Sequence, residues 1–476
     1  MTTQTTKTVI PIEDVRGWCG QDVLDPSGEK LGGLAMSYSP RLDLNRRPDV
    51  ATWERCLQQP TQTDVADPRR RAARRDAPTP RYALSGATGS GRKVSVRGPA
   101  DVVAAGGWTI AIRMRSCLLF VITVIVFGSA VPTATPATNS ERPVRLRVAV
   151  SGDLLIHSPV FNRALANGGG HRYDFASMFR HLRPYLRRAD LAVCHVETPM
   201  TSRPPSGYPL FNTPRALARA IASAGWDVCS TASNHTLDQG QFGVDATIGS
   251  LDRAGVAHAG SYRSAAARRR PAILTVQGLR VALLSYTEHT NGLALPAPWS
   301  VNLARAERIL ADARRARRAG AQVVIVNVHA GDEYRHAPSA FQRRLVRRLL
   351  RSRTITAVIG QHAHVVQPIT EIAGRLVVYG AGNLISNQSA ACCPAATQDG
   401  LIAILQIEWD SRRGARVRRI RYVPTWVRHP DYAVLPVGDA ARLGLADRAT
   451  LRASYHRTVA VVGRSTRVQP VPSRAP

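Results

Sequence analysis

The chain has 476 residues, of which 44% are apolar, and a formal net charge of +31. This length and apolar content suffice for one large core or two ordinary ones, which excludes a wholly disordered protein. All but three of the 64 basic residues are arginine, a bias that a GC-rich genome produces without any function. The sequence also contains no aromatic-interleaved basic patch and no recognisable nucleic-acid module, so we expect no nucleic-acid partner.

The N-terminal part differs in composition from the rest. All 13 histidines lie at or beyond His157, and residues 1–112 show little helical or strand periodicity. We interpret 1–112 as low-complexity sequence that is either disordered or upstream of the true start. Residues 113–140 begin with arginines around Met114, continue with the apolar run Cys117–Phe127 and reach small residues at 128–130. This pattern is typical of a secretory signal peptide or a short membrane anchor.

Two explanations account for a signal that begins at position 113. Either translation starts at or near Met114, or a cytoplasmic N-terminal region precedes a single membrane anchor. Both predict that the chain beyond about residue 140 is extracytoplasmic, secreted or anchored to the cell membrane. The seven cysteines show no CxxC pair and no zinc-ribbon spacing. An exported protein permits a disulfide between Cys194 and Cys229, but we expect buried free thiols there, and we assign no role to Cys392 and Cys393.

From Val144 onward, apolar strand-like runs alternate with amphipathic helices in a domain predicted over 141–465, followed by a disordered tail at 466–476. The strand-like runs are 146–153, 191–197, 227–235, a hairpin over 272–287, 321–331, 355–364 and several runs between 365 and 427. The predicted helices are Phe175–Arg188, one that opens at Thr213-Pro214, Phe242–Ala254, Ala304–Ala319 and Ser339–Arg351. This order predicts an α/β sandwich, in which a mixed sheet packs on a second sheet and helices cover both outer faces.

Polar side chains stand where these buried runs stop. They are Asp153, Glu197, Asn234 with His235, His329, and His362 with His364. A single histidine at a strand end is usually structural, but in α/β folds the carboxyl ends of several strands line one ligand crevice. If His362 and His364 lie on an extended strand, alternation directs both imidazoles to one side.

These donors predict a metal site. Carboxylates, imidazoles and one amide oxygen without a thiolate suit one or two divalent ions of Mn, Fe, Zn or Co, and paired ions favour phosphoester hydrolysis. In that arrangement Glu197 bridges the ions, Asn234 donates its amide oxygen, and His235 protonates the leaving group.

Six ordered motifs carry a family resemblance. They are GDLLIH at 152–157, HVETP at 195–199, SNHTLDQG at 233–240, VHAGDEY at 328–334, GQHAHVVQP at 360–368 and YGAGNLISN at 379–387. This succession resembles the CapA-type bacterial capsule-synthesis proteins, which are associated with poly-γ-glutamate and are similar to calcineurin-like metallophosphoesterases. The resemblance implies a four-layer α/β/β/α fold, His235 as the catalytic histidine, and as metal ligands Asp153, Glu197, Asn234, His329, His362 and His364.

The chain departs from the superfamily pattern in its first two motifs. The first motif is Asp-x-His, but position 155 is leucine, and the second motif has aspartate where this chain has Glu197. One metal position is therefore expected to be weakened, and a single bound ion is an alternative to two. His157 is the candidate substitute for the absent histidine.

Two functions follow from this pattern. The first is an exported metal-dependent hydrolase of a phosphoester or an amide, with an anionic envelope polymer as substrate or partner. The alternative is a non-catalytic or weakly catalytic component of a complex for capsular polymer synthesis or export. Glu333 and Tyr334 follow His329 closely enough to contact the ligands or substrate, with loop packing as the alternative. Asp238 either orients His235 or is a turn residue.

Overall fold

The computed structural model of the protein describes residues 143–476. The predictions for 1–112 and 113–140 therefore lie outside the described residues. Within 143–476, no helix combines the length and the apolar character that crossing a bilayer requires.

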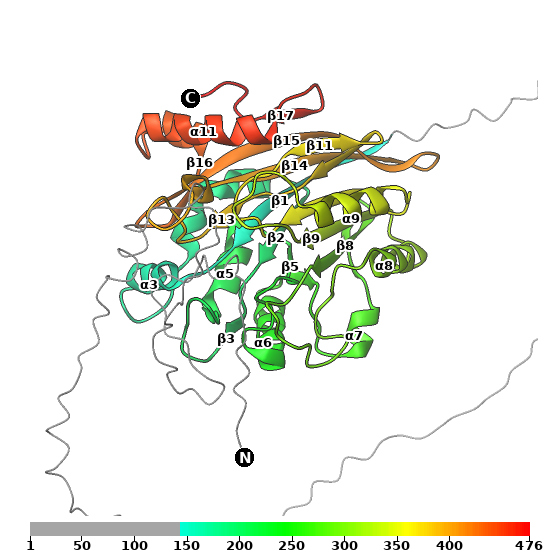
Figure 1. The fold of residues 1–476 in the computed structure, drawn as a ribbon, viewed down its shortest axis with the longest axis horizontal. Coiled ribbons are helices and arrows are strands. Elements are labelled where there is room, and N and C mark those ends of the chain that lie inside the picture. Colours follow the sequence, from blue (N-terminus) through cyan, green and yellow to red (C-terminus); the bar gives the residue numbers. More distant parts are fainter. Residues whose placement is uncertain (1–142) are drawn as a thin grey trace, which may run out of the picture. The chain divides into compact units, whose positions relative to one another are not determined.

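Two β-sheets organise this part of the chain (Figure 1). The first contains β1 (Val144–Leu154), β2 (Leu191–Val196), β5 (Val228–Ser230), β6 (Ala257–Ala259), β13 (Asn383–Ile385), β14 (Asp399–Asp410), β15 (Gly414–Arg428), β16 (Ala433–Pro436) and β17 (Val468–Pro470). Its order is β16-β15-β14-β1-β2-β5-β6, with β13 paired to β1 and β17 to β15.

The second sheet contains β7 (Ala272–Val276), β8 (Leu279–Thr287), β9 (Val323–His329), β10 (Ala357–Gln361), β11 (Ile369–Ile372) and β12 (Arg375–Val378). Its order is β11-β12-β10-β9-β8-β7. The antiparallel pair β7–β8 is the hairpin predicted over 272–287. The strands that lead to the predicted polar residues are parallel neighbours, β1–β2–β5 in one sheet and β9–β10 in the other. Their carboxyl ends therefore lie along common sheet edges.

Three apolar cores separate four layers (Figure 1). The inner core joins the two sheets, with Val148 and Leu191 from the first packed among Ile325 and Ile359 from the second. The outer core of the first sheet is covered by α3 (Ser158–Asn167), a 3-10 helix (Ala176–Leu182), α4 (Arg183–Arg187) and α5 (Ala216–Ala224). The outer core of the second sheet is covered by α8 (Ala306–Arg318) and α9 (Ala340–Leu350). The predicted four-layer α/β/β/α fold is confirmed.

Further helices complete the described part. They are α6 (Gly240–Arg253), α7 (Ala265–Arg269), α10 (Val437–Arg442) and α11 (Arg448–Val462). Helix α9 starts where its sequence predicts, because Ser339 and Gln342 form a capping box at its first turn. The helix predicted to open at Thr213-Pro214 begins later, at Ala216. The Thr213 N–H donates to Pro199 O at 2.8 Å, so Thr213 and Pro214 form β4, which pairs with β3 (Met200–Thr201).

The C-terminal segment is a correction to the prediction of a disordered tail at 466–476. Residues Val468–Pro470 form β17, and Ile420 of β15 lies opposite Val468 in parallel register. The Val468 side chain joins the inner core, and Tyr455 Oη donates to Pro472 O at 2.8 Å. Burial of Val468 and the hydrogen bonds with β15 stabilise this strand. The segment has too few apolar residues for its sequence alone to predict a strand.

The cysteines on β2 and β5 are a second correction. Cys194 lies opposite Cys229 in the parallel ladder, with the Cα atoms 4.5 Å apart, and the two form a disulfide. The expectation of free thiols is therefore wrong. The pairing depends on strand register, which a separation of 35 residues does not reveal.

Candidate metal centre

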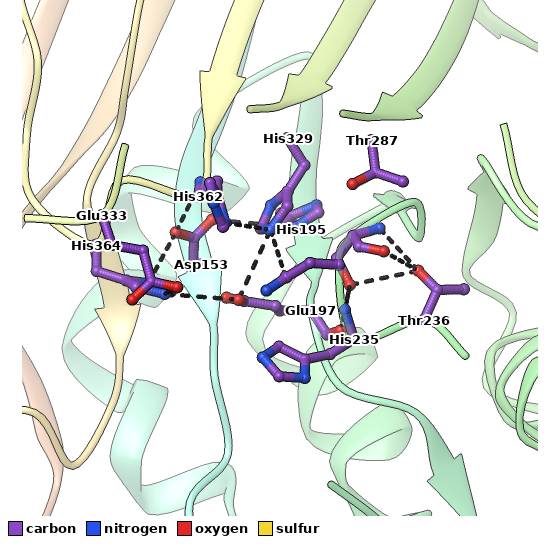
Figure 2. Close-up of polar contacts among 12 residues, drawn as sticks. Asp153, His195, Glu197, His235, Thr236, Thr287, His329, Glu333, His362 and His364 are labelled. Atoms are coloured by element: carbon purple, nitrogen blue, oxygen red, sulfur yellow. Dashed lines mark hydrogen bonds and ion pairs between the residues drawn. The ribbon is translucent and has the colours of Figure 1, made fainter. Parts of the chain in front are cut away.

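The predicted polar residues converge on one buried site between the sheets, at the carboxyl ends of their parallel strands (Figure 2). Alternation directs two of the strand residues there. Val323 and Ile325 of β9 face the inner core, so His329 faces the same side, and the same argument directs His195 of β2 inward. The side chains of this metal-ligand cluster are all at most 3% exposed: Asp153, His195, Glu197, Asn234, His329, His362 and His364.

One half of the cluster is centred on His329. Its Nε2 atom lies 2.8 Å from Asn234 Oδ1, 3.0 Å from His362 Nδ1 and 3.7 Å from Glu197 Oε1. Four atoms with lone pairs thus surround a small volume, as the ligands of a single ion would.

The other half is centred on His364. Its Nδ1 atom lies 3.6 Å from Asp153 Oδ2, and its Nε2 atom lies 3.8 Å from Glu197 Oε1. His195 Nε2 approaches Asp153 Oδ1 to 4.0 Å. Glu197 Oε1 therefore lies between the two halves (Figure 2), the position that a bridging carboxylate requires.

The backbone that carries His362 and His364 differs from the extended strand that the sequence predicts. Strand β10 ends at Gln361, and both histidines have positive φ angles, 95° and 55°. Such angles are uncommon for residues with a side chain and cost about 1–3 kcal/mol each, so they persist where the surroundings impose them. The His362 N–H donates to Asp153 Oδ2 at 3.2 Å, which ties this turn to the first sheet. Both imidazoles reach the site through a turn and not through strand alternation.

The cluster fits a divalent cation. Within the described residues, five of its buried atoms have no hydrogen-bond partner: Asp153 Oδ1, His195 Nε2, Glu197 Oε1 and Oε2, and His329 Nδ1. An unpaired buried carboxylate is costly. The ligand atoms also form two triplets, Asp153–His195–His329 and Glu197–His362–His364, within each of which all atoms lie within 4.8 Å. A cation bound among them would compensate the buried negative charge.

Burial and neighbouring charges shift the protonation equilibria of the cluster in opposite directions. Burial alone lowers the pKa of His364, but the charge of Glu197 and the hydrogen bond to Asp153 outweigh it and raise this pKa to about 10. Burial raises the pKa of the Glu197 carboxyl to about 8, against the charge of His364. Burial also lowers the pKa of His195 to about 4 and, together with neighbouring imidazoles, holds the pKa values of His329 and His362 well below their usual range. Neutral imidazoles retain the lone pair that binds a metal ion.

His235 lies beside the cluster in a different electrostatic setting. Its Nδ1 atom is 2.8 Å from Asp238 Oδ2, and the same oxygen accepts the Phe211 N–H at 2.8 Å. Burial alone lowers the pKa of His235, but the charge and hydrogen bond of Asp238 and the charge of Glu197 outweigh burial, so the net pKa is raised. His235 is therefore suited to hold a proton near neutral pH.

Glu333 and Tyr334 reach the site from the loop after β9. Glu333 Oε1 lies 3.9 Å from His364 Nε2, and its side chain is 33% exposed, so it stands at the rim (Figure 2). Tyr334 donates its N–H to Ala363 O at 2.8 Å. Its hydroxyl accepts from Gln388 Nε2 at 3.0 Å, Gln388 Oε1 accepts from Asn383 Nδ2 at 2.9 Å, and Asn383 Oδ1 lies 3.1 Å from His364 Nδ1. Tyr334 is thereby linked to a residue of the cluster.

The structure places one residue in the cluster that the sequence argument did not select. His195 of β2 precedes Glu197, the residue that follows the strand, by two positions, and in an extended chain this spacing puts both on one face and would have identified His195. His157, the candidate substitute for the histidine absent at 155, is in neither ligand triplet. Its ring packs against Phe211 with centroids 5.3 Å apart, and its Nδ1 accepts the Asn387 N–H at 3.3 Å.

Residues 147–388 match the protein family described as "Bacterial capsule synthesis protein PGA_cap". The matched segment is just over half of the chain and includes every residue of the metal-ligand cluster. The chain belongs to this family. The resemblance drawn from the six motifs is confirmed.

Curated relatives of this PGA_cap protein include the "Capsule biosynthesis protein CapA" of Bacillus anthracis, 25% identical over 293 residues, which are 58% of this chain and 69% of that protein. The "PGA biosynthesis protein CapA" of Bacillus subtilis (strain 168) is 24% identical over 229 residues, 44% of this chain and 57% of the relative. A "Probable polyglutamine synthesis accessory protein" of Mycobacterium tuberculosis is 28% identical over 225 residues, 42% of this chain and 56% of the relative. The chain thus spans about two thirds of the first relative and little more than half of the others.

Solved structures with partial similarity include two enzymes. One is the calcineurin-like phosphoesterase YfkN from Bacillus subtilis, with 13% identity and a TM-score of 0.39, covering 66% of this chain and 99% of that one. The other is the NAD nucleotidase of Haemophilus influenzae, with 10% identity and a TM-score of 0.39, covering 69% of this chain and 64% of that one.

Proposed function

We propose that this chain is an exported, metal-dependent hydrolase of phosphoester type that acts in the biosynthesis of a capsule or poly-γ-glutamate-type envelope polymer. The observation that carries the proposal is the position of Glu197 Oε1, which lies 3.7 Å from His329 Nε2 and 3.8 Å from His364 Nε2. A buried carboxylate between two sets of imidazoles is the arrangement that a pair of cations requires. Mn, Fe, Zn and Co all suit these donors.

The residues that would hold the ions are Asp153, Glu197, Asn234, His329, His362 and His364. Divalent ions held there supply Lewis-acid polarisation of a phosphoryl group and neutralise its charge. Burial of the site strengthens these electrostatic interactions. His235 delivers a proton to the leaving-group oxygen from Nε2, because Asp238 engages Nδ1. Glu333, at the rim, positions His364 or the substrate.

A metal-dependence assay tests this function. The full chain is treated with a chelator, reloaded with Mn²⁺, Zn²⁺ or Co²⁺, and assayed with nitrophenyl phosphate mono- and diesters and with an amide-linked glutamate polymer. Hydrolysis is expected only in the reloaded protein. If the protein binds the ions but hydrolyses neither ester nor an amide-linked glutamate polymer, the alternative of a non-catalytic component of a capsule-synthesis complex is favoured.

The extracytoplasmic location is part of the proposal. The disulfide between Cys194 and Cys229 supports it, because disulfides persist in oxidising compartments. We expect the segment from Met114 to Ala130, placed at the N-terminus of a reporter, to direct that reporter across the membrane. Activity of an export-dependent reporter such as alkaline phosphatase measures this result. Retention of the fusion in the cytoplasm would contradict both the signal and the location.

An arginine-rich cleft supports an anionic polymer as the partner. Its volume is about 1100 Å³, and its basic lining residues are Arg145, Arg147, Arg375, Arg416, Arg418, Arg419 and Arg467. Gln406 of β14 lies opposite both Arg147 of β1 and Arg419 of β15, so these two arginines stand in one row across the sheet. Neither guanidinium has an ion-pair partner among residues 143–476. Of the two lining acids, Glu408 is paired with Arg416, and Asp190 accepts the Arg147 N–H through Oδ2 at 2.6 Å. Guanidinium groups without an ion-pair partner can bind the carboxylates of an anionic polymer.

Neutralising this row is expected to weaken binding of poly-γ-glutamate. The double variant Arg147→Gln/Arg419→Gln should bind a fluorescent polymer about tenfold more weakly at low salt, which corresponds to about 1.4 kcal/mol, and the difference should shrink as salt increases. Fluorescence anisotropy measures the affinity. The matched control is Arg448→Gln/Arg452→Gln on the exposed face of α11, and an equal loss in the control would mean that general charge and not the cleft binds the polymer.

A further inference from the structure

Strand β1 supplies one ligand to the cluster, Asp153, and then an apolar residue where the resembled motif has histidine. Leu155 is 2% exposed, and its N–H donates to Ile385 O at 3.0 Å. Its neighbours Leu154 and Ile156 pack in the outer core, so alternation puts the Leu155 side chain on the inner side with Asp153. A second ion beside Asp153 therefore needs a nitrogen from another strand.

His195 stands where such a nitrogen is needed. In the β1–β2 ladder it lies directly opposite Asp153, and its Nε2 atom is 4.0 Å from Asp153 Oδ1. Its ring stacks on His329 with centroids 4.7 Å apart and planes 28° from parallel. The side chain is fully buried, and neither His195 Nε2 nor Asp153 Oδ1 has a hydrogen-bond partner in the part of the chain that the structure describes. At 4.0 Å the two atoms are too far apart for a hydrogen bond, but both can bind one ion between them.

A hydrogen-bond chain indicates which nitrogen of His195 carries the proton. Ser230, its neighbour on β5, donates its hydroxyl hydrogen to Cys194 O at 3.2 Å. The same hydroxyl lies 2.8 Å from His195 Nδ1. A hydroxyl has one hydrogen, so while it donates to Cys194 O it accepts from His195, and Nδ1 then carries the proton. Nε2 is then left with a free lone pair, which is how a hydrogen bond at one ring nitrogen prepares the other for a metal ion.

We propose that His195 is a metal ligand that replaces the histidine absent at position 155. With Asp153 and His329 it forms one triplet of ligand atoms that lie within 4.8 Å of one another, next to the triplet of Glu197, His362 and His364, and each triplet would hold one ion. The inference rests on the proposed metal-dependent function. It adds that two ions are bound and that strand β2 supplies the missing nitrogen. A purely structural histidine would pair Nε2 with a protein group.

Metal counting tests the proposal independently of activity. The full chain and its variants are stripped of metal, titrated with Mn²⁺, and analysed by elemental analysis and electron paramagnetic resonance, which detects exchange coupling between two adjacent ions. We expect two coupled ions in the parent protein and one uncoupled ion in His195→Ala. His195→Gln, which retains a polar side chain beside Ser230, is expected to behave in the same way and guards against a folding defect. His157→Ala is the matched control and should keep two coupled ions.

A compensating substitution makes the test sharper. Leu155→His in the His195→Ala background should restore the second ion and the coupled signal, because position 155 lies on the same inner side. A coupled pair that survives His195→Ala, or a single uncoupled ion in the parent, would overturn the role of His195 while the hydrolase proposal stands. A parent protein that binds no ion at micromolar Mn²⁺ would overturn both.

Discussion

Replacement of His235 by alanine is expected to lower phosphoester hydrolysis by about 10²–10⁴-fold while the metal content stays unchanged, the range typical for loss of a positioned general acid. His235 is not among the atoms that form the two ligand triplets, and its Nδ1 is engaged by Asp238 at 2.8 Å. The variant therefore loses the proton donor without losing an ion. Steady-state kinetics and elemental analysis of the same preparation measure the two effects.

The pH profile separates a general acid from a structural residue. A general acid works in its protonated form, so the rate falls as pH rises through the pKa of His235. Asp238 is a main cause of the raised pKa of His235. In Asp238→Asn, which removes this charge, we expect the alkaline fall in rate to move to lower pH. An unchanged profile in Asp238→Asn, or a His235→Ala variant with parental activity, would exclude His235 as the acid.

Replacement of His362 by alanine is expected to reduce metal content and thermal stability together. An ion that binds only the folded protein stabilises it by about 2.7 kcal/mol when its concentration is 100 times the dissociation constant. His362 Nδ1 lies 3.0 Å from His329 Nε2, so the variant lacks one of the four ligand atoms of this half of the cluster. Thermal denaturation with and without Mn²⁺ measures the effect. The increase in melting temperature that Mn²⁺ produces in the parent protein should be much smaller in the variant.

A partly buried histidine outside the cluster provides the control for this experiment. His258 pairs with Asp252 at 3.2 Å, away from the cluster, so His258→Ala should keep the full stabilisation by Mn²⁺. If the parent protein binds no divalent ion and His362→Ala melts like the parent, the histidines at the strand ends are structural.

Much of the fold and of the site could be predicted from local sequence. Short apolar runs identify buried strands such as those that end near Asp153 and His329, and an amphipathic pattern with a capping residue locates α9. These signals are local because side-chain alternation and helix capping depend on neighbouring residues. The donor types were equally readable, since carboxylates and imidazoles without thiolates restrict the chemistry whatever the fold.

Contacts between distant segments were decided only by the tertiary structure. The disulfide and the position of His195 both depend on the β1–β2–β5 register, in which Asp153 lies opposite His195 and Cys194 opposite Cys229. The left-handed backbone at His362 depends on its hydrogen bond to Asp153, 209 residues earlier in the chain. Strand register and such turns are set by packing between segments that meet only in the folded state, so no local pattern specifies them.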